Sequence, residues 1–256
     1  MLPVPSPALA GEGQGGGSMP LLTSRIALVT GASRGIGAAV AVELARLGAH
    51  CVLVARSQGG LEETDDAIRA AGGQATLLPM DLHKDAEKID SIGPSIVQRF
   101  GRLDILVHNA GSLGKLTPVA HIEPRDWAET IGVNLTAAWR LIRSCDPPLR
   151  ASDAGRAVFV TTGRVARPLA YWGLYGAGKA GMEHLVLTWA QEVERTRLRV
   201  NLFDPGIVAT RMRARAMPGE DPSTLNRPED VAPALVALCG PGETRHAETV
   251  RVPPKG

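Results

Sequence analysis

The stretch RIALVTGASRGIG, residues 25–37, decides the fold of this chain. Its first six residues form an apolar run that suits a buried strand, and glycines follow at positions 31, 35 and 37. From 36 to 47, apolar side chains then recur every three or four residues, which is the period of one helix face. A strand, a glycine-rich turn and a helix in this order predict the first unit of a nucleotide-binding α/β fold.

The glycine turn has a physical use in such a fold. Glycines let the backbone turn tightly and approach a phosphate, and the following helix N-terminus offers free N–H groups with partial positive charge. The alternative, an ordinary glycine-rich connection, is disfavoured because a second strand follows at the correct distance. We therefore expect a dinucleotide to contact Gly31, Ser33, Arg34, Gly35, Ile36 and Gly37.

The end of the second strand indicates which dinucleotide is bound. An NAD site usually places Asp or Glu there to hold the ribose 2′-hydroxyl, whereas this chain has Ala55 and Arg56. Arg34 adds a second cation inside the turn. Two cations favour charge-assisted contacts to a 2′-phosphate, so we predict NADP(H) rather than NAD(H), with solvated surface arginines as the alternative.

Further short apolar runs alternate with helical patterns along the chain. Near-continuous apolar runs are typical of parallel strands that are buried on both faces. The expected strands cover 25–30, 51–55, 75–80, 103–108, 157–162 and 198–203, with a weaker one at 248–252. The expected helices after the first cover about 60–71, 85–100, 124–144, 172–195 and 229–239. This alternation predicts a single-domain, Rossmann-like, doubly wound parallel sheet flanked by helices on both faces.

The ends of the chain and its composition narrow the class of protein. Residues 1–22 are rich in Pro, Gly and Ser, so we expect a disordered tail or an over-extended start, with Met19 as the true beginning and one domain over 23–256. The 28 basic and 26 acidic residues are too balanced to suggest a nucleic-acid partner. We expect no membrane span, no signal peptide and no metal site. Three scattered cysteines are typical of reduced thiols in a cytoplasmic protein.

The segment WGLYGAGKAG, residues 172–181, places a tyrosine and a lysine among four glycines at the start of a predicted helix. Tyr175 and Lys179 are four residues apart and share a helix face. An ammonium about 4 Å from the phenol would stabilise the phenolate by about 4 kcal/mol at an effective dielectric near 20. That would bring the tyrosine pKa toward neutrality, where acid–base catalysis is most efficient. We interpret the glycines as room for a flat cofactor ring and a substrate.

These motifs together resemble the short-chain dehydrogenase/reductase (SDR) family over about residues 23–252. The family's pattern is carried by TGASRGIG (30–37), Asp81–Leu82, HNAG (108–111), GVNLTAAW (132–139), YGAGK (175–179) and DPGIVAT (204–210). The segments SDAG (152–155) and MRARAMPGEDP (212–222) are similar to those of a bacterial subgroup, the YciK-like oxidoreductases.

The resemblance implies an NADP-dependent reaction on CH–OH and C=O groups. Tyr175 would be the proton donor or base, Lys179 would hold the nicotinamide ribose, and Asn134 would support a water in a proton relay. Asp81 and Leu82 would lie at the adenine. The remaining cofactor contacts implied are Asn109, Ala110, Gly111, Pro205, Gly206, Val208 and Thr210.

Two residues depart from the family's pattern. A serine usually lies thirteen residues before the tyrosine, and here that residue is Thr162. Threonine keeps the hydroxyl that would polarise a carbonyl, while its methyl group stiffens χ1 and should narrow the pocket. His108 stands where asparagine is common, and we interpret it as structural.

The substrate is expected beyond the carboxyl ends of the strands, between 112–117, 163–172 and 207–220. Five arginines in these segments raise the hypothesis of an anionic substrate, against the alternative that most are solvated or ion-paired: Arg164, Arg167, Arg211, Arg213 and Arg215. The leading interpretation is a carbonyl reductase or alcohol dehydrogenase acting on a small molecule. The alternatives are a catalytically idle NADP-binding regulator or scaffold, and an epimerase or dehydratase of the extended relatives. By analogy with relatives, a homodimer or homotetramer is expected.

Overall fold

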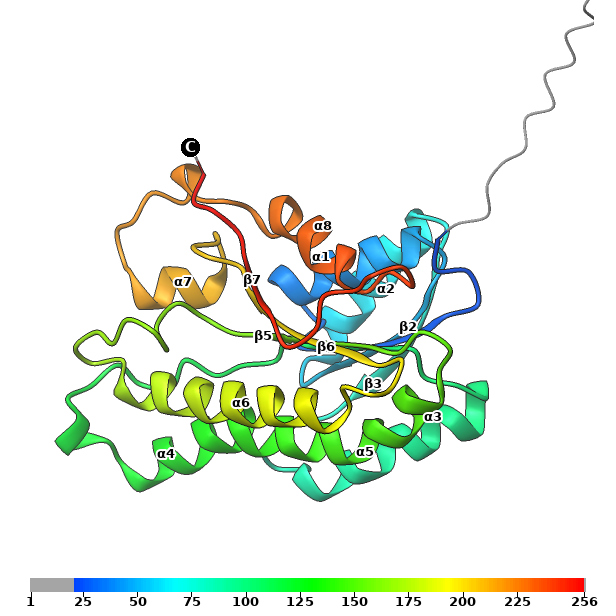
Figure 1. Ribbon diagram of the computed structural model, residues 1–256. Coiled ribbons are helices and arrows are strands. Elements are labelled where there is room, and N and C mark those ends of the chain that lie inside the picture. Colours follow the sequence, from blue (N-terminus) through cyan, green and yellow to red (C-terminus); the bar gives the residue numbers. More distant parts are fainter. Residues whose placement is uncertain (1–20, 256) are drawn as a thin grey trace, which may run out of the picture.

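The computed structural model describes residues 21–255, and their core is one seven-stranded sheet (Figure 1). The strands are β1 (Ile26–Thr30), β2 (His50–Ala55), β3 (Gln74–Pro79), β4 (Ile105–His108), β5 (Arg156–Val160), β6 (Arg199–Asp204) and β7 (Thr249–Arg251). Their order is β3-β2-β1-β4-β5-β6-β7, and every neighbouring pair is parallel. The predicted fold class is confirmed, including the weak last strand.

Helices cover both faces of the sheet. One face packs on α1 (Gly35–Arg46), α2 (Gln58–Ala70) and α8 (Pro228–Ala237). The other face packs on α3 (Ile92–Phe100), α5 (Ala137–Ala151) and α6 (Gly173–Glu192), with α4 (Pro124–Ile131) leading into α5 (Figure 1). Because the five inner strands are buried from both sides, their apolar residues run on without alternation, whereas the edge strands β3 and β7 are partly exposed.

The strand order reverses between β1 and β4, which are neighbours in the sheet although two strands separate them in the chain. In open α/β sheets, ligands bind outside the carboxyl ends of the strands at such a switch point. Thr30 and His108, the last residues of β1 and β4, are paired there. The glycine turn and the residues after β4 therefore lie at the same edge.

Two expected helices differ in detail from the structure. The segment predicted as one helix over 85–100 is a 3₁₀-helix, Ala86–Ser91, followed by α3. The segment predicted over 124–144 reaches Ala151 and contains a π-helical turn, Gly132–Thr136, between α4 and α5. A π-turn inserts an extra residue into a helix, and such turns are frequent at functional sites.

The first described residues also differ from the expectation. Residues 1–20 lie outside the described residues, so the predicted tail and the start at Met19 fall there. Leu22, which the sequence placed in that tail, is buried, and its N–H donates to the Leu47 carbonyl at 2.8 Å. The described fold therefore includes the residue just before the predicted domain boundary.

Candidate active site

The glycine turn is compact because its glycines pack against the residues that follow β4. Gly31 has a φ of +67°, and a Cβ there would lie 2.8 Å from both Asn109 Nδ2 and Ala110 Cα. A Cβ on Gly37 would overlap the Gly31 carbonyl oxygen. These two positions need glycine for close approach, which leaves the N-terminus of α1 open at the carboxyl edge of the sheet.

The other residues of the turn have different surroundings. Gly35, at a φ of +58°, faces the loop after β6, because a Cβ there would lie 3.6 Å from Thr210 Cγ2. Ser33 lies against the first turn of α2, next to Gly60, whereas Ile36 packs toward the core. The arrangement brings the predicted phosphate-binding turn and the predicted nicotinamide loop face to face.

Two arginines are exposed on the side of β2, as an extra phosphate would require. Arg34 is the N-cap of α1, and Arg56 follows β2 directly. Arg56 Nη1 lies 4.0 Å from Asp81 Oδ2 and 3.9 Å from Glu129 Oε1, which are loose pairs of a guanidinium that is itself mostly exposed. Such exposed pairs are weak, so the guanidinium remains able to bind another anion.

Asp81 and Leu82 lie beside this cationic edge. Burial opposes ionisation of Asp81, but backbone N–H groups of Lys84 and His83 and the charge of Arg56 lower its pKa overall. Asp81 Oδ1 accepts from the N–H of His83 at 2.9 Å and of Lys84 at 3.1 Å. Leu82 is buried. The aspartate is therefore an ionised acceptor that its own turn holds in place.

The end of β4 is tied to the end of β1 by side-chain hydrogen bonds. Asn109 Nδ2 donates to the carbonyls of Thr30 and Gly31, each at 3.2 Å. The Thr30 hydroxyl lies 2.9 Å from His108 Nδ1 and accepts from the Ala110 N–H at 3.1 Å. Burial, with the nearby charge of Lys179, lowers the pKa of His108 to about 3. His108 is thus a neutral, fully buried residue of the sheet edge.

Four predicted catalytic residues come together between β5 and α6. Tyr175 is 8% exposed, Lys179 is 3% exposed and Asn134 is fully buried. A Cβ added to Gly111 would lie 3.5 Å from Asn134 Oδ1 and 3.6 Å from Lys179 Nζ, which shows how closely these groups approach. Thr162, two residues beyond β5, is hydrogen-bonded to the Tyr175 hydroxyl.

Asn134 and Lys179 have separate partners within this group. Asn134 lies in the π-turn, where its Oδ1 accepts from the Ser112 N–H at 2.7 Å and its Nδ2 donates to the Ser112 carbonyl at 2.8 Å. Lys179 Nζ donates to the Val160 carbonyl at 2.7 Å. The asparagine side chain therefore fixes the loop after β4, and the ammonium is fixed to the end of β5.

The acid–base properties of the pair differ from the expectation. Burial raises the pKa of Tyr175 to about 12, with the hydrogen bond from Thr162 acting in the opposite direction. Burial lowers the pKa of Lys179 to about 8. The expected lowering of the tyrosine pKa by Lys179 is not found, because desolvation dominates and the ammonium is directed at the Val160 carbonyl.

The glycines of α6 also have a role other than the predicted one. A Cβ on Gly178 would lie 3.0 Å from Asn134 Cβ, and one on Gly181 would lie 3.0 Å from Leu135 Cδ2. Gly173 similarly faces Val119 at 2.8 Å. The interpretation of these glycines as room for a cofactor and a substrate is wrong, since they let α6 pack closely on the π-turn and its neighbours. Gly176 alone faces open space.

An apolar cluster covers the Tyr175 side of the site. Its members are Leu113, Leu116, Trp172, Tyr175, Met212, Ala216 and Met217. Met212, Ala216 and Met217 come from α7 (Arg211–Ala216) and the residue after it, a short helix that the sequence did not predict. Trp172 and Tyr175 contact edge to face, with ring centroids 5.8 Å apart.

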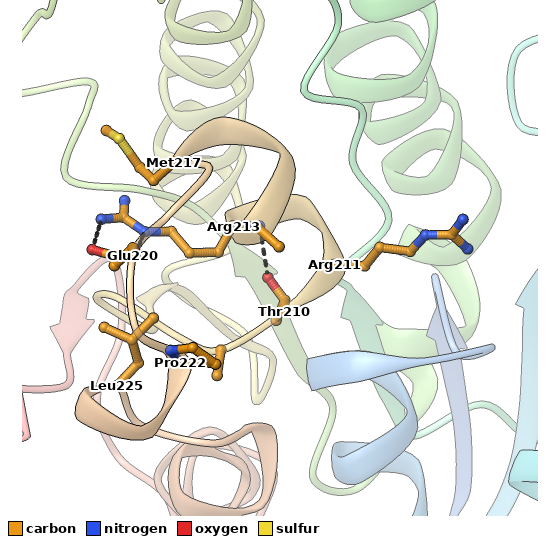
Figure 2. A pocket seen from close by; sticks show the side chains of 9 residues that line it. Thr210, Arg211, Arg213, Met217, Glu220, Pro222 and Leu225 are labelled. Carbon is orange, nitrogen blue, oxygen red and sulfur yellow. Dashed lines mark hydrogen bonds and ion pairs between the residues drawn. The ribbon is translucent and has the colours of Figure 1, made fainter.

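Only some of the substrate-side arginines are free to bind an anion. Arg213 is paired with Glu220 through two hydrogen bonds of 2.6 Å, and Figure 2 shows that Arg211 points away from this pair. The Arg164 guanidinium lies over the Trp172 ring, 5.3 Å from its centroid. The cavity of about 250 Å³ beside α7 is lined by Arg213 and Glu220 and not by Tyr175.

The loop after β6 carries the last predicted cofactor contacts. Gly206 has a φ of +69°, and Pro205 and Val208 are buried. Thr210 is the N-cap of α7, and its Oγ1 accepts from the Arg213 N–H at 3.2 Å (Figure 2). Its hydroxyl thus holds the short helix whose residues cover Tyr175.

Two acidic residues near the site were missed by the sequence. Glu183 lies one turn beyond Lys179 on α6 and accepts a hydrogen bond from the Thr161 hydroxyl. Asp204, at the end of β6, is buried and accepts from Arg251 Nε at 2.7 Å. The spacing of four residues between Lys179 and Glu183 was the available signal, because such pairs share a helix face.

Of the helices between residues 21 and 255, none has both the length and the apolar character needed to span a bilayer. Within the same residues, no group of three His, Cys, Asp or Glu side chains is arranged to hold a metal ion. All three cysteines are buried and unpaired.

Comparison with known proteins gives consistent matches over most of the chain. A sequence model described as short chain dehydrogenase matches residues 25–221. The uncharacterized oxidoreductase YciK of Escherichia coli K12 is 37% identical over 227 residues, which cover 88% of this chain and 90% of YciK. The predicted resemblance is confirmed.

Solved structures agree with these sequence matches. A short chain dehydrogenase structure from Pseudomonas syringae superposes with a TM-score of 0.87 at 36% identity, covering 91% of this chain and 96% of the other. One from Shigella flexneri 2a, solved in complex with NADP, gives a TM-score of 0.86 at 35% identity, covering 91% and 99%.

Proposed function

This chain belongs to the short-chain dehydrogenase family, and from that premise we propose that it is an NADP(H)-dependent oxidoreductase that interconverts a carbonyl group and a secondary alcohol. The observation that carries the proposal is the group formed by the buried Tyr175 and Lys179 with the partly exposed Thr162 at the carboxyl end of β5. A phenol, a second hydroxyl and an ammonium at one point supply a proton donor, a carbonyl-polarising group and a positive charge.

The proposed roles follow from the contacts of each side chain. The Tyr175 hydroxyl gives its proton to the substrate oxygen as negative charge develops there. The Thr162 hydroxyl, which donates to the phenol in this structure, would turn its single proton to the same substrate oxygen. Lys179 would keep a positive charge at the end of β5, one helical turn from the phenolate that is left after proton transfer. Asn134 supports the return of a proton to Lys179.

The protonation state of Tyr175 fits the role of proton donor. A phenol whose pKa is raised to about 12 is protonated at neutral pH, and a protonated phenol is a donor. Alcohol oxidation needs the phenolate instead. We therefore infer that Tyr175 is ready to act as the donor in carbonyl reduction near neutrality and that the rate of alcohol oxidation rises at alkaline pH.

The chain's residues fit an NADP(H) cofactor. The open N-terminus of α1, with the positive φ angles of Gly31 and Gly35, suits a pyrophosphate. Arg34 and Arg56 would bind the 2′-phosphate, and no carboxylate stands directly after β2 to repel it. When bound, NADPH supplies the hydride that reduces the carbonyl carbon. The relative from Shigella flexneri, solved with NADP, supports this assignment.

The surroundings of Tyr175 favour an apolar substrate. Leu113, Trp172 and the two methionines of the cluster contribute side chains without charge, and methionine adapts to irregular apolar shapes. Arg164 is stacked and Arg213 is ion-paired, so neither supports an anionic substrate as directly as the sequence suggested.

The cellular compartment and the oligomeric state of the protein are also proposed. Three buried, unpaired thiols suit a reducing compartment such as the cytoplasm. Trp127 on α4 and Trp139 on α5 are 48% and 44% exposed, which is compatible with the predicted homodimer or homotetramer. The assembly stays a prediction.

The test is turnover of NADPH against a panel of apolar ketones, diketones, aldehydes and acyl thioesters, followed by NADPH absorbance. The wild type should reduce at least one member, and Tyr175→Phe should lose at least about a hundredfold of kcat, as expected when a general acid is removed. Tyr175 is predicted to contact the cofactor as well as the substrate, but NADPH affinity should be largely retained in the variant, because phenylalanine keeps the aromatic ring and the cationic contacts of Lys179, Arg34 and Arg56 remain.

The outcomes separate the two functional classes. Turnover that survives in Tyr175→Phe contradicts the proposed proton donor. Tight NADPH binding without turnover of any carbonyl favours the idle regulator or scaffold. If neither NADPH nor NADH binds, the interpretation of the glycine turn is wrong.

A further inference from the structure

The end of β5 makes successive contacts with one face of α6. The Thr162 hydroxyl bonds Tyr175, the Val160 carbonyl accepts from Lys179 Nζ at 2.7 Å, and the Thr161 hydroxyl donates to Glu183. The three α6 residues are each one turn apart, so they form a single column of side chains. Glu183 is the third member of this column, and the proposed reaction does not use it.

Among the groups around the column, Glu183 supplies the negative charge that acts on Lys179. Lys179 is 3% exposed, and the charged or titratable groups facing it are Tyr175 and Glu183 on α6 and His108 on β4. His108 is neutral and Tyr175 is protonated near neutral pH, because the pKa of His108 is lowered to about 3 and that of Tyr175 is raised to about 12. The carboxylate of Glu183 is therefore the anion that favours the ammonium form, and it opposes the effect of burial on the Lys179 pKa.

Glu183 has other charged neighbours at the ends of β6 and β7. Asp204 and burial raise the pKa of Glu183, while the Thr161 hydroxyl, Lys179 and Arg251 lower it. Asp204 is itself paired with Arg251, at 2.7 Å from Nε. Because that pair is nearly neutral as a unit, the negative charge that acts on Lys179 is that of Glu183.

We propose that Glu183 is a positioning residue for the reaction proposed above, whose carboxylate holds the ammonium of Lys179 in its charged form at the end of β5. The inference rests on the proposed function, because Lys179 is needed there as a cation that would hold the nicotinamide ribose of the bound cofactor. Burying a lysine without a counter-charge favours its neutral form.

The first test follows NADPH binding against pH in the full-length protein, with NADPH itself as the probe. Wild-type affinity should fall as pH rises through about 8, where Lys179 loses its proton. In Glu183→Gln the fall should begin about one pH unit lower, the size expected for loss of a charge one turn away in a half-buried site. Below the pKa of Glu183 the two proteins should bind NADPH alike.

Matched variants separate charge from structure. Glu183→Gln keeps an oxygen that can accept from Thr161, whereas Thr161→Val removes this hydrogen bond and keeps the charge. Of these two variants, only Glu183→Gln should shift the pH dependence of NADPH binding. Glu183→Asp keeps the negative charge and should therefore bind NADPH with a pH dependence close to that of the wild type. Glu192→Gln changes an exposed glutamate near the end of the same helix and should leave the profile in place.

The second test needs no nucleotide. A double-mutant cycle of Glu183→Gln and Lys179→Met, read from urea unfolding, should give a coupling of about tenfold in the unfolding equilibrium at pH 7. The coupling should vanish well above the Lys179 pKa. A zero coupling at pH 7, or an unchanged pH profile in Glu183→Gln, overturns the proposal. If the wild type binds no NADPH at any pH, the proposed function fails while the cycle still decides the role of Glu183.

Discussion

Gly176 and Gly178 lie two residues apart on α6 and have opposite surroundings. A Cβ on Gly176 meets nothing within 4 Å, whereas one on Gly178 lies 3.0 Å from Asn134 Cβ. Alanine is favoured over glycine in a helix by about 1 kcal/mol. At Gly176 this gain is unopposed, but at Gly178 it is offset by a contact that displaces the π-turn.

We therefore expect Gly176→Ala to raise the free energy of unfolding by up to about 1 kcal/mol and Gly178→Ala to lower it by about 1–3 kcal/mol, as overpacking usually does. Urea unfolding measures both. NADPH turnover should fall in Gly178→Ala, because Asn134 must move. Equal effects of the two substitutions would contradict the packing role assigned to Gly178.

The glycines also show what a sequence can predict at this scale. Tyr175 and Lys179 were identified correctly as neighbours because their spacing fixes a shared helix face. The role of Gly178 and Gly181 could not be predicted, since their partners, Asn134 and Leu135, are about forty residues earlier in the chain and reach them only through packing. The pKa of Tyr175 likewise depends on burial and on the direction of the Lys179 ammonium, which spacing does not determine.

At the scale of elements, the unit from β1 to β2 sets the choice of nucleotide. Arg56 follows β2 where a carboxylate would favour NAD. Arg56→Ala should weaken NADPH binding about tenfold to hundredfold, the range of a lost hydrogen bond to a charged group, and leave NADH binding nearly unchanged. Titration of the fluorescence of each reduced nucleotide measures this.

Arg69→Ala is the control for this substitution. Arg69 is an exposed arginine at the end of α2, paired with Asp65 at 2.6 Å. It should not alter the ratio of the two affinities. Equal losses for NADPH and NADH in Arg56→Ala would mean that the side chain contacts the nucleotide elsewhere than at a 2′-phosphate.

The predicted helices and strands agree with the structure where a repeating sequence pattern extends over the whole helix or strand. The apolar runs gave the strands of the sheet, and the glycine turn was placed correctly before α1. The sequence missed α7, a six-residue helix that is capped by Thr210 and held by contacts with Leu113 and Trp172. A helix this short lacks a repeating pattern, so tertiary contacts decide whether it forms.

At the scale of the whole molecule, the buried thiols should make the free energy of unfolding fall at alkaline pH. Burial raises the pKa of Cys51 and Cys145 to about 12, and it raises that of Cys239 as well. Above the ordinary thiol pKa of 9.0 the unfolded chain loses these protons and the folded protein keeps them. Stability is therefore full below pH 9 and falls as pH rises toward 12.

Other buried groups also affect how the free energy of unfolding changes with pH. Tyr175, with its pKa raised to about 12, adds to the loss above pH 10. Lys179 acts in the opposite direction, because its pKa is lowered to about 8 and the unfolded chain binds its proton up to about 10.5. The three thiols and the phenol outnumber the lysine, so we expect a net fall.

The free energy of unfolding, measured with urea from neutral to strongly alkaline pH, tests this expectation. Each thiol should remove about 1.4 kcal/mol per pH unit within its window. A variant with Cys51→Ala, Cys145→Ala and Cys239→Ala should start less stable but decline less steeply. Parallel curves for the two proteins would show that the thiols do not control the alkaline loss.

The π-turn between α4 and α5 has a geometric consequence for the whole helical layer. An extra residue rotates everything beyond it by about 100° around the helix axis, since an α-helix has 3.6 residues per turn. The half that follows buries Leu141, Cys145 and Leu149 against the sheet, while the half before it presents Trp127 outward. Deleting one residue there would give a continuous α-helix in which the apolar face of α5 and the outward face of α4 could not both keep their present directions. The π-turn therefore sets which face of α5 is buried relative to α4, and Asn134 lies within this turn.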